Sequence, residues 1–424
     1  MIRAINGTKD IPPGESYLWQ NLETAAHALF DLYGYREIRT PLFEATELFA
    51  RGIGAETDVV SKEMYTFENR PDKDGKSDSL TLRPEATAGI VRAVIEHSLS
   101  QNDPLAKVYT IGPMFRAERV QRGRQRQFHQ IDVEAFGFVK PAIDVEMIEL
   151  ALTYLTRVGL PHYELVLNSV GCARCRPVYL ETLKTALRER IGLLCASCQR
   201  RTERNPLRVL DCKVPDDQET IDDLPRIADH LCAECHDHFD EVKRGLRLFE
   251  IPYTLSHRLV RGLDYYTRTT FEVTSEAGGL GAQNSVLGGG RYDGLVKELG
   301  GPDIPGIGFA IGLERLVLGL PADESEPTRG DVFLVPLVAE ALDAILLAQR
   351  ALRRVGIRAL TDPEGRSLKS QMKRADKLGT PYVVLLGADE LARGVFMVRS
   401  MTTSEQEEVD AADLVEYLQG AVTP

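Results

Sequence analysis

A cluster of arginines stands out in an otherwise acidic chain. Residues 116–126 contain five arginines and one glutamate, whereas the formal net charge of all 424 residues is −12. Guanidinium groups bind phosphate oxygens through charge-assisted hydrogen bonds, often in pairs. The acidic average opposes nonspecific binding of nucleic acid, but a local basic segment can still hold one phosphate-bearing partner. We therefore expect residues 116–126 to contact phosphate groups; a solvated run of charges is the alternative.

The next segment, residues 127–136, alternates in the manner of a β-strand whose two faces differ. One predicted face carries Phe128, Gln130, Asp132 and Glu134. The other carries His129, Ile131, Val133 and Ala135. A polar front and an apolar back are expected of a sheet that lines an active site. Because His129 falls on the apolar face, we predict a structural role for it.

The cysteines form a second chemical cluster. All seven fall between residues 172 and 235, and six of them form three C-x-x-C pairs. The pairs are Cys172 with Cys175, Cys195 with Cys198, and Cys232 with Cys235, and Cys212 stands apart. Nineteen residues separate the first two pairs, which is within the spacing of known zinc modules. In a reducing compartment such pairs indicate free thiols or a metal before disulfides.

Regular elements must position these groups. The spacing of apolar residues predicts a helix over residues 15–34, and residues 68–79 are predicted to form a loop. Strands are predicted at 107–115 and 127–136, as an antiparallel pair joined by the arginine-rich segment. Later predicted elements are a strand at 265–273, a glycine-rich turn at 287–294, and a strand running into a helix at 306–320.

The length of the chain indicates two or three domains. Residues 169–247 hold all the cysteines and mainly helical patterns, so we predict an inserted domain there. Residues 322–330 have the composition of a linker, and alternating strands and helices follow it, as expected of a small α/β domain. No apolar run approaches 18 residues and the N-terminal segment lacks the apolar core of a signal peptide. We therefore expect a cytoplasmic protein without a membrane partner.

Several strings together resemble one family. FRAER at 115–119 and GLER at 312–315 resemble motifs 2 and 3 of class II aminoacyl-tRNA synthetases. Four further strings resemble the histidine-specific members, the histidyl-tRNA synthetase family. They are TLRPEATA at 81–88, RQFHQIDVEAFG at 126–137, LVRGLDYYTRTTFEV at 259–273 and LGGGRYDGL at 287–295. Each string alone is weakly specific, but their ordered combination along nearly the whole chain is highly specific.

The resemblance implies an α+β fold with four parts. A class II catalytic core, an antiparallel sheet with flanking helices, is expected at 1–168 and 248–325, interrupted by the helical insertion at 169–247. Residues 331–424 are expected to form an α/β anticodon-binding domain. The family is homodimeric, and Pro41 lies in the segment that resembles the interface-forming motif 1.

The resemblance also implies the reaction, in which ATP and Mg²⁺ activate histidine for transfer to tRNA(His). Negative charge must then be stabilised at the α-phosphate, for which arginines are suited. Three arginines are implied to be catalytic: Arg116 at the α-phosphate, Arg315 at the γ-phosphate, and Arg261 on the opposite side of the α-phosphate. The implied ATP-binding residues are Arg116, Glu118, Phe128 and Arg315, with Phe128 under the adenine.

Histidine and tRNA contacts follow from the same resemblance. The implied histidine-binding residues are Glu85, Ala86, Thr87, Gln130, Glu134, Arg261, Tyr265 and Tyr266. Gly288, Gly289 and Gly290 would let substrate lie close to the backbone. Arg119 and Gln121 are candidates for contact with the acceptor end of tRNA. Arg366, Lys369, Lys373 and Arg374 are candidates for contact with the anticodon stem, and a solvent-facing helix is the alternative for them.

Two questions stay open at this point. The family's catalysis needs no zinc, so any zinc ion bound by the cysteines would be structural. A regulatory subunit of ATP phosphoribosyltransferase shares the fold and binds histidine without charging tRNA. That relative typically lacks the anticodon domain and keeps the histidine-specific arginine poorly, so residues 331–424 and Arg261 favour the enzyme. A zinc-containing RNA-binding protein is a more distant alternative, opposed by the complete ATP motifs.

Overall fold

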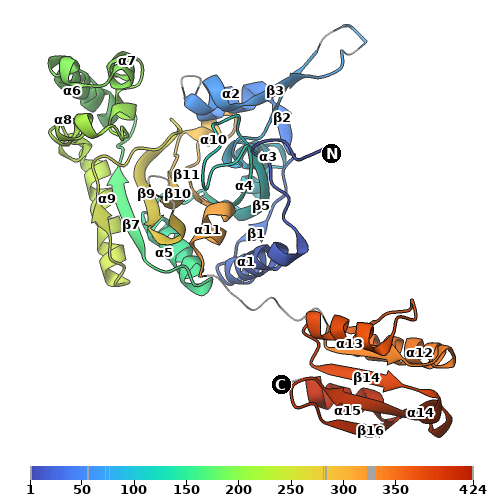
Figure 1. Cartoon of the computed structure of the whole chain (residues 1–424). Helices are drawn as coiled ribbons and strands as arrows, with labels where there is room; N and C mark the ends of the chain where they lie inside the picture. The colour runs from blue at the N-terminus through green and yellow to red at the C-terminus, as the bar shows by residue number, and fades with distance from the viewer. Residues whose placement is uncertain are drawn as a thin grey trace. The chain divides into compact units, whose positions relative to one another are not determined.

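The computed structural model describes residues 2–54, 57–71, 73–75, 77–279, 281, 284–321 and 330–422. The chain divides into two compact units, Met1–Ala322 and Asp323–Pro424, and each is described by itself (Figure 1). Eight of the nine residues of the predicted linker at 322–330 lie outside the described residues. Among the described residues, no helix is both long and apolar enough to cross a membrane.

The first unit is built on a large mixed sheet. Its eight strands, counted over the described residues, run in the order β1-β5-β6-β11-β10-β9-β7-β8. The six inner strands are antiparallel, and the edge strands β1 and β8 pair in parallel with β5 and β7. The strands are β1 Arg36–Glu37, β5 Lys107–Phe115, β6 Gln127–Phe136, β7 Tyr163–Ser169, β8 Thr254–Leu255, β9 Thr267–Ser275, β10 Ser285–Arg291 and β11 Gly306–Gly312.

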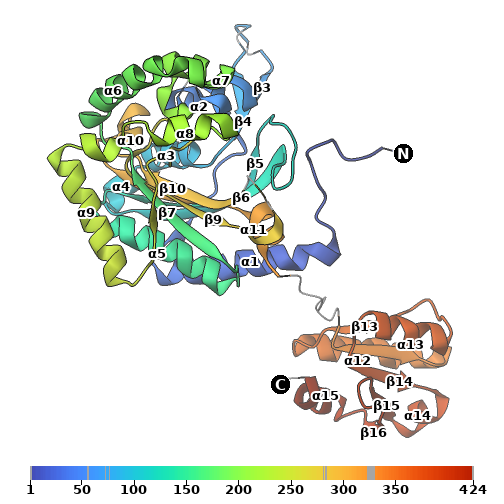
Figure 2. The ribbon, with the colours of Figure 1, turned by 60° about the vertical axis from the view of Figure 1, so that its left-hand side comes forward.

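Helices cover both faces of this sheet (Figure 2). On one face lie α1 (Pro13–Leu32), α5 (Ala142–Arg157) and α11 (Leu313–Gly319), in one hydrophobic core with the apolar side of the strands. Ile131, Val133 and Ala135 of β6 belong to that core, as the alternation predicts. On the other face lie α3 (Thr87–Glu96) and α10 (Leu295–Glu298), which share a second core with Tyr265, Tyr266 and Tyr292.

A small sheet lies beside α3, ordered β2-β4-β3. Its strands are β2 Phe43–Ala45, β3 Tyr65–Glu68 and β4 Ser79–Leu82, followed along the chain by α3 and the short α4 (Leu99–Asn102). Helix α2 (Thr46–Ile53) packs on α3 and β4. The described part of the predicted loop at 68–79 connects β3 to β4, which pair as a hairpin.

The predicted turn at 287–294 is wrong in its first half, because residues 285–291 form strand β10 between β9 and β11. Glycine is usually weak in a strand, but a close approach by other groups can require it. A Cβ atom on Gly288 would lie 1.9 Å from Arg261 Nη2, and one on Gly290 would lie 2.8 Å from Tyr266 Cδ1. The glycines therefore make room for these two side chains.

The insertion follows β7 and is helical over its described length (green in Figure 1). Its helices are α6 Cys175–Glu189, α7 Ala196–Arg204, α8 Gln218–Asp222 and α9 Ala233–Leu248. The first three surround a small core that includes Tyr179, Leu183 and Val209. Helix α9 instead joins the main core, where its Val242 and Leu246 pack with α5.

The second unit is a five-stranded sheet of order β13-β12-β14-β15-β16 with helices. Its strands are β12 Val332–Pro336, β13 Ala359–Thr361, β14 Tyr382–Leu386, β15 Val395–Ser400 and β16 Gln406–Asp410. Its helices are α12 Leu342–Arg354, α13 Leu368–Lys377, α14 Ala388–Arg393 and α15 Leu414–Val422. Strand β12 is parallel to β13 and β14, and β14, β15 and β16 are antiparallel. The α/β pattern expected after the linker is thus present.

Candidate active site

One cavity on the polar side of the large sheet collects the predicted phosphate-binding groups. It lies between β6, β10, the loop between β5 and β6, and the start of α11. Its lining includes Arg116, Glu118, Phe128, Gln130, Arg261, Gly288 and Arg315. Residues separated by almost 200 positions in sequence therefore meet in one place.

Arg116 is held at the mouth of the arginine-rich loop. Its Nε donates a hydrogen bond to the carbonyl of Pro84 at 2.9 Å, and its Cζ lies 5.1 Å from the centre of the Phe128 ring. One side of the guanidinium is thereby fixed to the backbone and to an aromatic face, a favourable cation–π geometry. Glu118 lines the same cavity and pairs with Arg124 at 3.0 Å.

Arg315 approaches the cavity from the first turn of α11. It donates hydrogen bonds to the carbonyls of Gly123 at 3.0 Å and of Ser285 at 2.6 Å. Burial, and then the nearby positive charge of Arg124, lower the pKa of Arg315 to about 10. A buried guanidinium beside another cation favours the binding of an anion, because the anion offsets both the desolvation and the repulsion.

Arg261 occupies the middle of the cavity, above the glycines of β10. Its Nη1 donates to Glu272 Oε2 on β9 at 2.5 Å. Its Nη2 lies over Gly288, where any side chain would collide with it. The predicted proximity of substrate to Gly288–Gly290 is therefore limited by the protein's own side chains.

A pocket of buried carboxyls adjoins this cavity on the same face of β6. Glu134 accepts hydrogen bonds from Thr87 Oγ1, at 2.6 Å, and from the hydroxyl of Tyr292. Glu85 accepts the backbone N–H groups of Thr87 at 2.8 Å and of Ala88 at 2.9 Å. Glu85 thus caps the start of α3, and Thr87 connects the two glutamates.

Burial makes these carboxyls costly to ionise. It is the main cause that raises the pKa of Glu134 to about 8, and the charges of Asp132 and Glu85 raise it further. Burial and the charge of Glu85 raise the pKa of Asp132 to about 8 as well. Asp132 Oδ2 and Gln130 Oε1 have no hydrogen-bond partner among the described residues. The pocket therefore favours a ligand that brings positive charge and hydrogen-bond donors.

Two tyrosines close the pocket. Tyr265 and Tyr266 are both buried, their ring centres lie 4.7 Å apart, and Tyr265 also packs edge-on against Tyr292. Ala86, buried at the start of α3, completes the set predicted to bind the amino acid. All eight predicted histidine-binding residues line either this pocket or the arginine cavity beside it.

The remaining predicted residues lie outside the cavity. Arg119 and Gln121 are exposed, and Gln121 pairs with Arg124 in a tight turn at the tip of the loop. His129 packs edge-on against Trp19 and its Nδ1 lies 3.0 Å from Glu314, which fits the structural role predicted for it. In the second unit, Lys369 and Lys373 are exposed, whereas Arg366 and Arg374 pair with the buried Asp362.

Three residues of the site were not singled out from the sequence. Asp132 shares the polar face of β6, so the alternation contained the signal, but its burial beside two other carboxyls was not foreseeable. Tyr292 stands in the glycine-rich string and reaches Glu134 only because β10 and β11 lie next to β6. Glu272 had no signal beyond its place on a predicted strand.

An antiparallel sheet whose polar face joins motif-borne arginines to a buried acidic pocket defines the catalytic domain of a class II aminoacyl-tRNA synthetase. The family model described as Histidyl-tRNA synthetase matches residues 7–316. A second model, described as Anticodon binding domain, matches residues 331–421. The chain belongs to the histidyl-tRNA synthetase family, and the fold expected from the sequence is confirmed.

Individual relatives agree. The histidine–tRNA ligase of Syntrophotalea carbinolica is 50% identical over 408 residues, which cover 96% of each chain. The crystal structure of apo histidyl-tRNA synthetase from S. aureus is similar with a TM-score of 0.81 and 38% identity, over 99% of this chain and 100% of that one. An ATP phosphoribosyltransferase regulatory subunit/histidyl-tRNA synthetase from Bacillus halodurans shares the fold, with a TM-score of 0.65 at 20% identity, over 92% of this chain and 99% of that one.

Proposed function

We propose that the chain is a histidine–tRNA ligase, which activates L-histidine with ATP and transfers it to the 3′ end of tRNA(His). One observation carries the proposal: a buried pocket of carboxyls adjoins a cavity lined by arginines. Activation brings together an amino acid with a cationic ammonium group and a polyanionic nucleotide. The two parts of the site have the charges that complement these two substrates.

The arginine cavity is proposed to bind MgATP. Arg116 would hold the α-phosphate and Arg315 the γ-phosphate, and Phe128 would lie under the adenine. Glu118 lines the same cavity and offers carboxylate oxygens, which are ligands that Mg²⁺ prefers. Magnesium would neutralise phosphate charge, and Arg261 would stabilise the additional charge that develops at the α-phosphate in the transition state.

The acidic pocket is proposed to bind histidine. Glu85, Thr87 and Gln130 would face the amino and carboxyl groups, and Gln130 Oε1 is available as an acceptor. The two ring nitrogens of histidine each need a partner, for which Glu134 and Tyr266 are proposed, with Tyr265 beside them. Because Glu134 already accepts from Thr87 and Tyr292, its orientation is set before the ligand binds.

tRNA is proposed to contact both units. The exposed Arg119 and Gln121 would meet the acceptor end, while the second unit would bind the anticodon stem. In that unit the unpaired-looking basic surface is smaller than the sequence indicates, since Arg366 and Arg374 already neutralise Asp362. Lys369 and Lys373 are therefore the better candidates for phosphate contacts.

We also propose a cytoplasmic homodimer. Leu42 and Phe43, next to Pro41 in the motif 1-like segment, are 43% and 52% exposed, and Phe67, which packs edge-on against Phe43, is 43% exposed. Neighbouring apolar side chains of this size favour burial against another surface. Sedimentation of the purified protein would give the assembly state, and Phe43→Asp should shift a dimer toward monomer.

The experiment that tests the function is charging of tRNA(His) with radiolabelled histidine. The full chain should form histidyl-tRNA, whereas a regulatory subunit that only senses histidine would form none. Gln121→Ala should slow transfer to tRNA and spare adenylate formation. A chain ending at Pro321 should keep some adenylate formation if it stays dimeric, but it should charge tRNA far less, because phosphate contacts and positioning are lost.

A further inference from the structure

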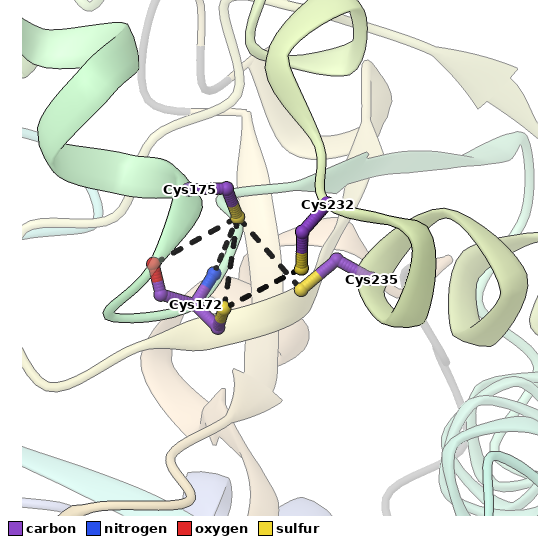
Figure 3. A group of neighbouring side chains, drawn as sticks. All are labelled: Cys172, Cys175, Cys232 and Cys235. Carbon is purple, nitrogen blue, oxygen red and sulfur yellow. Dashed lines mark hydrogen bonds between the residues drawn. The ribbon is translucent and has the colours of Figure 1, made fainter.

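Four cysteines from the two ends of the insertion converge on one point (Figure 3). Cys172 and Cys175 lie at the start of α6, and Cys232 and Cys235 lie at the start of α9. The Sγ atoms of Cys172 and Cys175 are 3.7 Å apart, and those of Cys172 and Cys232 and of Cys175 and Cys235 are 3.8 Å apart. The pairing joins the first C-x-x-C pair to the third, so the module suggested by the spacing of the first two pairs is wrong.

These separations have a simple geometric meaning. Zinc–thiolate bonds of about 2.3 Å in a tetrahedron place the sulfurs about 3.8 Å apart. A disulfide would bring two sulfurs to about 2.05 Å. All four cysteines are free, and their spacing is that of four ligands around one cation and not that of two covalent bonds.

The backbone around the first pair also favours thiolates. The N–H of Cys172 donates to Cys175 Sγ at 3.1 Å, and the N–H of Arg174 donates to Cys172 Sγ at 3.4 Å. Gly171 has a φ of +66°, and a Cβ atom there would lie 2.8 Å from Cys175 Sγ. The chain thus turns tightly around the sulfurs and directs N–H groups at them, which stabilises negative charge on sulfur.

We propose that Cys172, Cys175, Cys232 and Cys235 bind one structural zinc ion that clasps the neck of the insertion. A soft, tetrahedral set of four thiolates is a closed structural site, without an open position for catalysis. The ion would join the helix that enters the insertion to the helix that leaves it. Because α9 is fixed to α5, through His238 and Asp144 at 3.0 Å, the clasp would anchor the insertion to the catalytic core.

The neck contacts the proposed histidine pocket, a consequence that rests on the proposed function. Arg176, one residue after Cys175, donates to the carbonyls of Val170, at 3.1 Å, and of Tyr266. Gly171 accepts the N–H of Arg268 at 2.8 Å, two residues beyond Tyr266. Zinc would therefore act as a positioning element for the backbone that carries Tyr265 and Tyr266.

An independent observation carries a second site. The remaining cysteines, Cys195, Cys198 and Cys212, gather with Asp217, and their ligand atoms lie within 4.8 Å of one another. Asp217 is 1% exposed, its Oδ1 accepts the N–H of Cys195 at 2.8 Å, and its Oδ2 lies 3.2 Å from Cys212 Sγ. A buried carboxylate among three thiols is costly unless a cation offsets it. We infer a second zinc ion here, held by three cysteines and one aspartate.

Metal analysis of the purified full chain tests both sites. Wild-type protein, purified without chelator, should contain two zinc ions per chain. The double variant Cys232→Ser/Cys235→Ser should lose one of them, whereas His236→Asn, an exposed neighbour, should lose none. Asp217→Asn should lose the other, and Asp216→Asn, its exposed neighbour, should keep both. Unchanged zinc content in either ligand variant overturns the corresponding site.

Cobalt substitution keeps the proposal testable if the ligand variants do not fold. Wild-type protein in which cobalt replaces zinc should show sulfur-to-cobalt charge-transfer bands and the visible absorption of tetrahedral thiolate sites. Absence of these bands, or zinc-free protein with oxidised cysteines, overturns both sites. None of these readouts depends on catalysis, so failure of the zinc sites and failure of the proposed function are distinguishable. As a separate readout of positioning, loss of the neck zinc should raise the KM for histidine more than the KM for ATP.

Discussion

The catalytic face of the large sheet and the cysteine-rich insertion solve the same problem in different ways. Both bury groups that are costly to remove from water. On the sheet, Asp132 and Glu134 lie over strands backed by an extensive hydrophobic core, which holds them in place without a bound ion. In the insertion, short helices enclose a small core, and the buried thiols gather in two clusters suited to metal.

The difference teaches where each region obtains its stability. A large core supplies enough apolar burial to maintain strained electrostatics for a ligand that comes and goes. A small one usually requires disulfides or metal ions. On this account the sheet is prepared for substrates, whereas the insertion requires permanent ligands. The predictions below test that division, from the largest expected effect to the smallest.

Loss of the neck zinc should unfold the insertion and leave the sheet intact. Structural zinc contributes on the order of 10 kcal/mol to small modules, more than the insertion's core is expected to supply. In Cys232→Ser/Cys235→Ser, amide hydrogens of α6 should exchange far faster than in wild type, while those of β6 and β11 stay protected. His236→Asn is the matched control. Equal protection of α6 in both proteins would contradict the division.

Arg261→His should reduce the rate of adenylate formation by ~10²-fold or more, as expected for loss of one preorganised electrostatic donor. Histidine affinity should change much less, because the charge at the α-phosphate is greatest in the transition state. Pre-steady-state pyrophosphate formation measures the rate. Arg244→His, at an exposed position of α9, should behave as wild type. A near-normal rate in Arg261→His removes the assignment.

Glu134→Ala should weaken histidine binding by about 1–3 kcal/mol, roughly a 5- to 150-fold rise in KM, because a ring donor is left without its acceptor. The KM for ATP should stay near its original value. Steady-state pyrophosphate exchange with each substrate varied measures both constants, with the exposed Glu298→Ala as control. If both KM values rise together, Glu134 supports the fold and does not read the ring.

Asp132→Asn should flatten the dependence of stability on pH. In the folded protein burial raises the pKa of Asp132 to about 8, whereas the unfolded chain loses this proton near pH 4. Between these values the folded state binds more protons, so the free energy of unfolding falls as pH rises, by up to about 1.4 kcal/mol per pH unit for one group. Denaturant unfolding from pH 5 to 8 measures the slope. An equal slope in the variant would mean that Asp132 is ionised throughout.

Much of the catalytic site could be predicted because it is local. Alternation along β6 placed Phe128, Gln130 and Glu134 on one face, and the motif strings placed Arg116 and Arg315. The glycine-rich string was misread as a turn for its first half, since glycine favours turns when nothing is known of its neighbours. Only the pairing of β10 with β9 brings Arg261 and Tyr266 over those glycines.

The insertion was harder to predict because its pairing is non-local. Cys172 and Cys232 are 60 residues apart, yet their Sγ atoms lie 3.8 Å apart, because the insertion leaves and rejoins the core at one place. Spacing along the chain favoured the nearer pair. Asp217 carries no C-x-x-C signal, and aspartate is common on surfaces, so its burial among cysteines appears only in the folded structure.

The most direct test of the central claim is pyrophosphate exchange by the purified full chain across all twenty amino acids. The account predicts ATP–pyrophosphate exchange with histidine and background rates with the other nineteen, since the acidic pocket and its paired ring acceptors suit only a compact side chain with two ring nitrogens. Exchange supported equally by another amino acid, or no exchange with histidine while the protein is folded and holds its zinc, would contradict it.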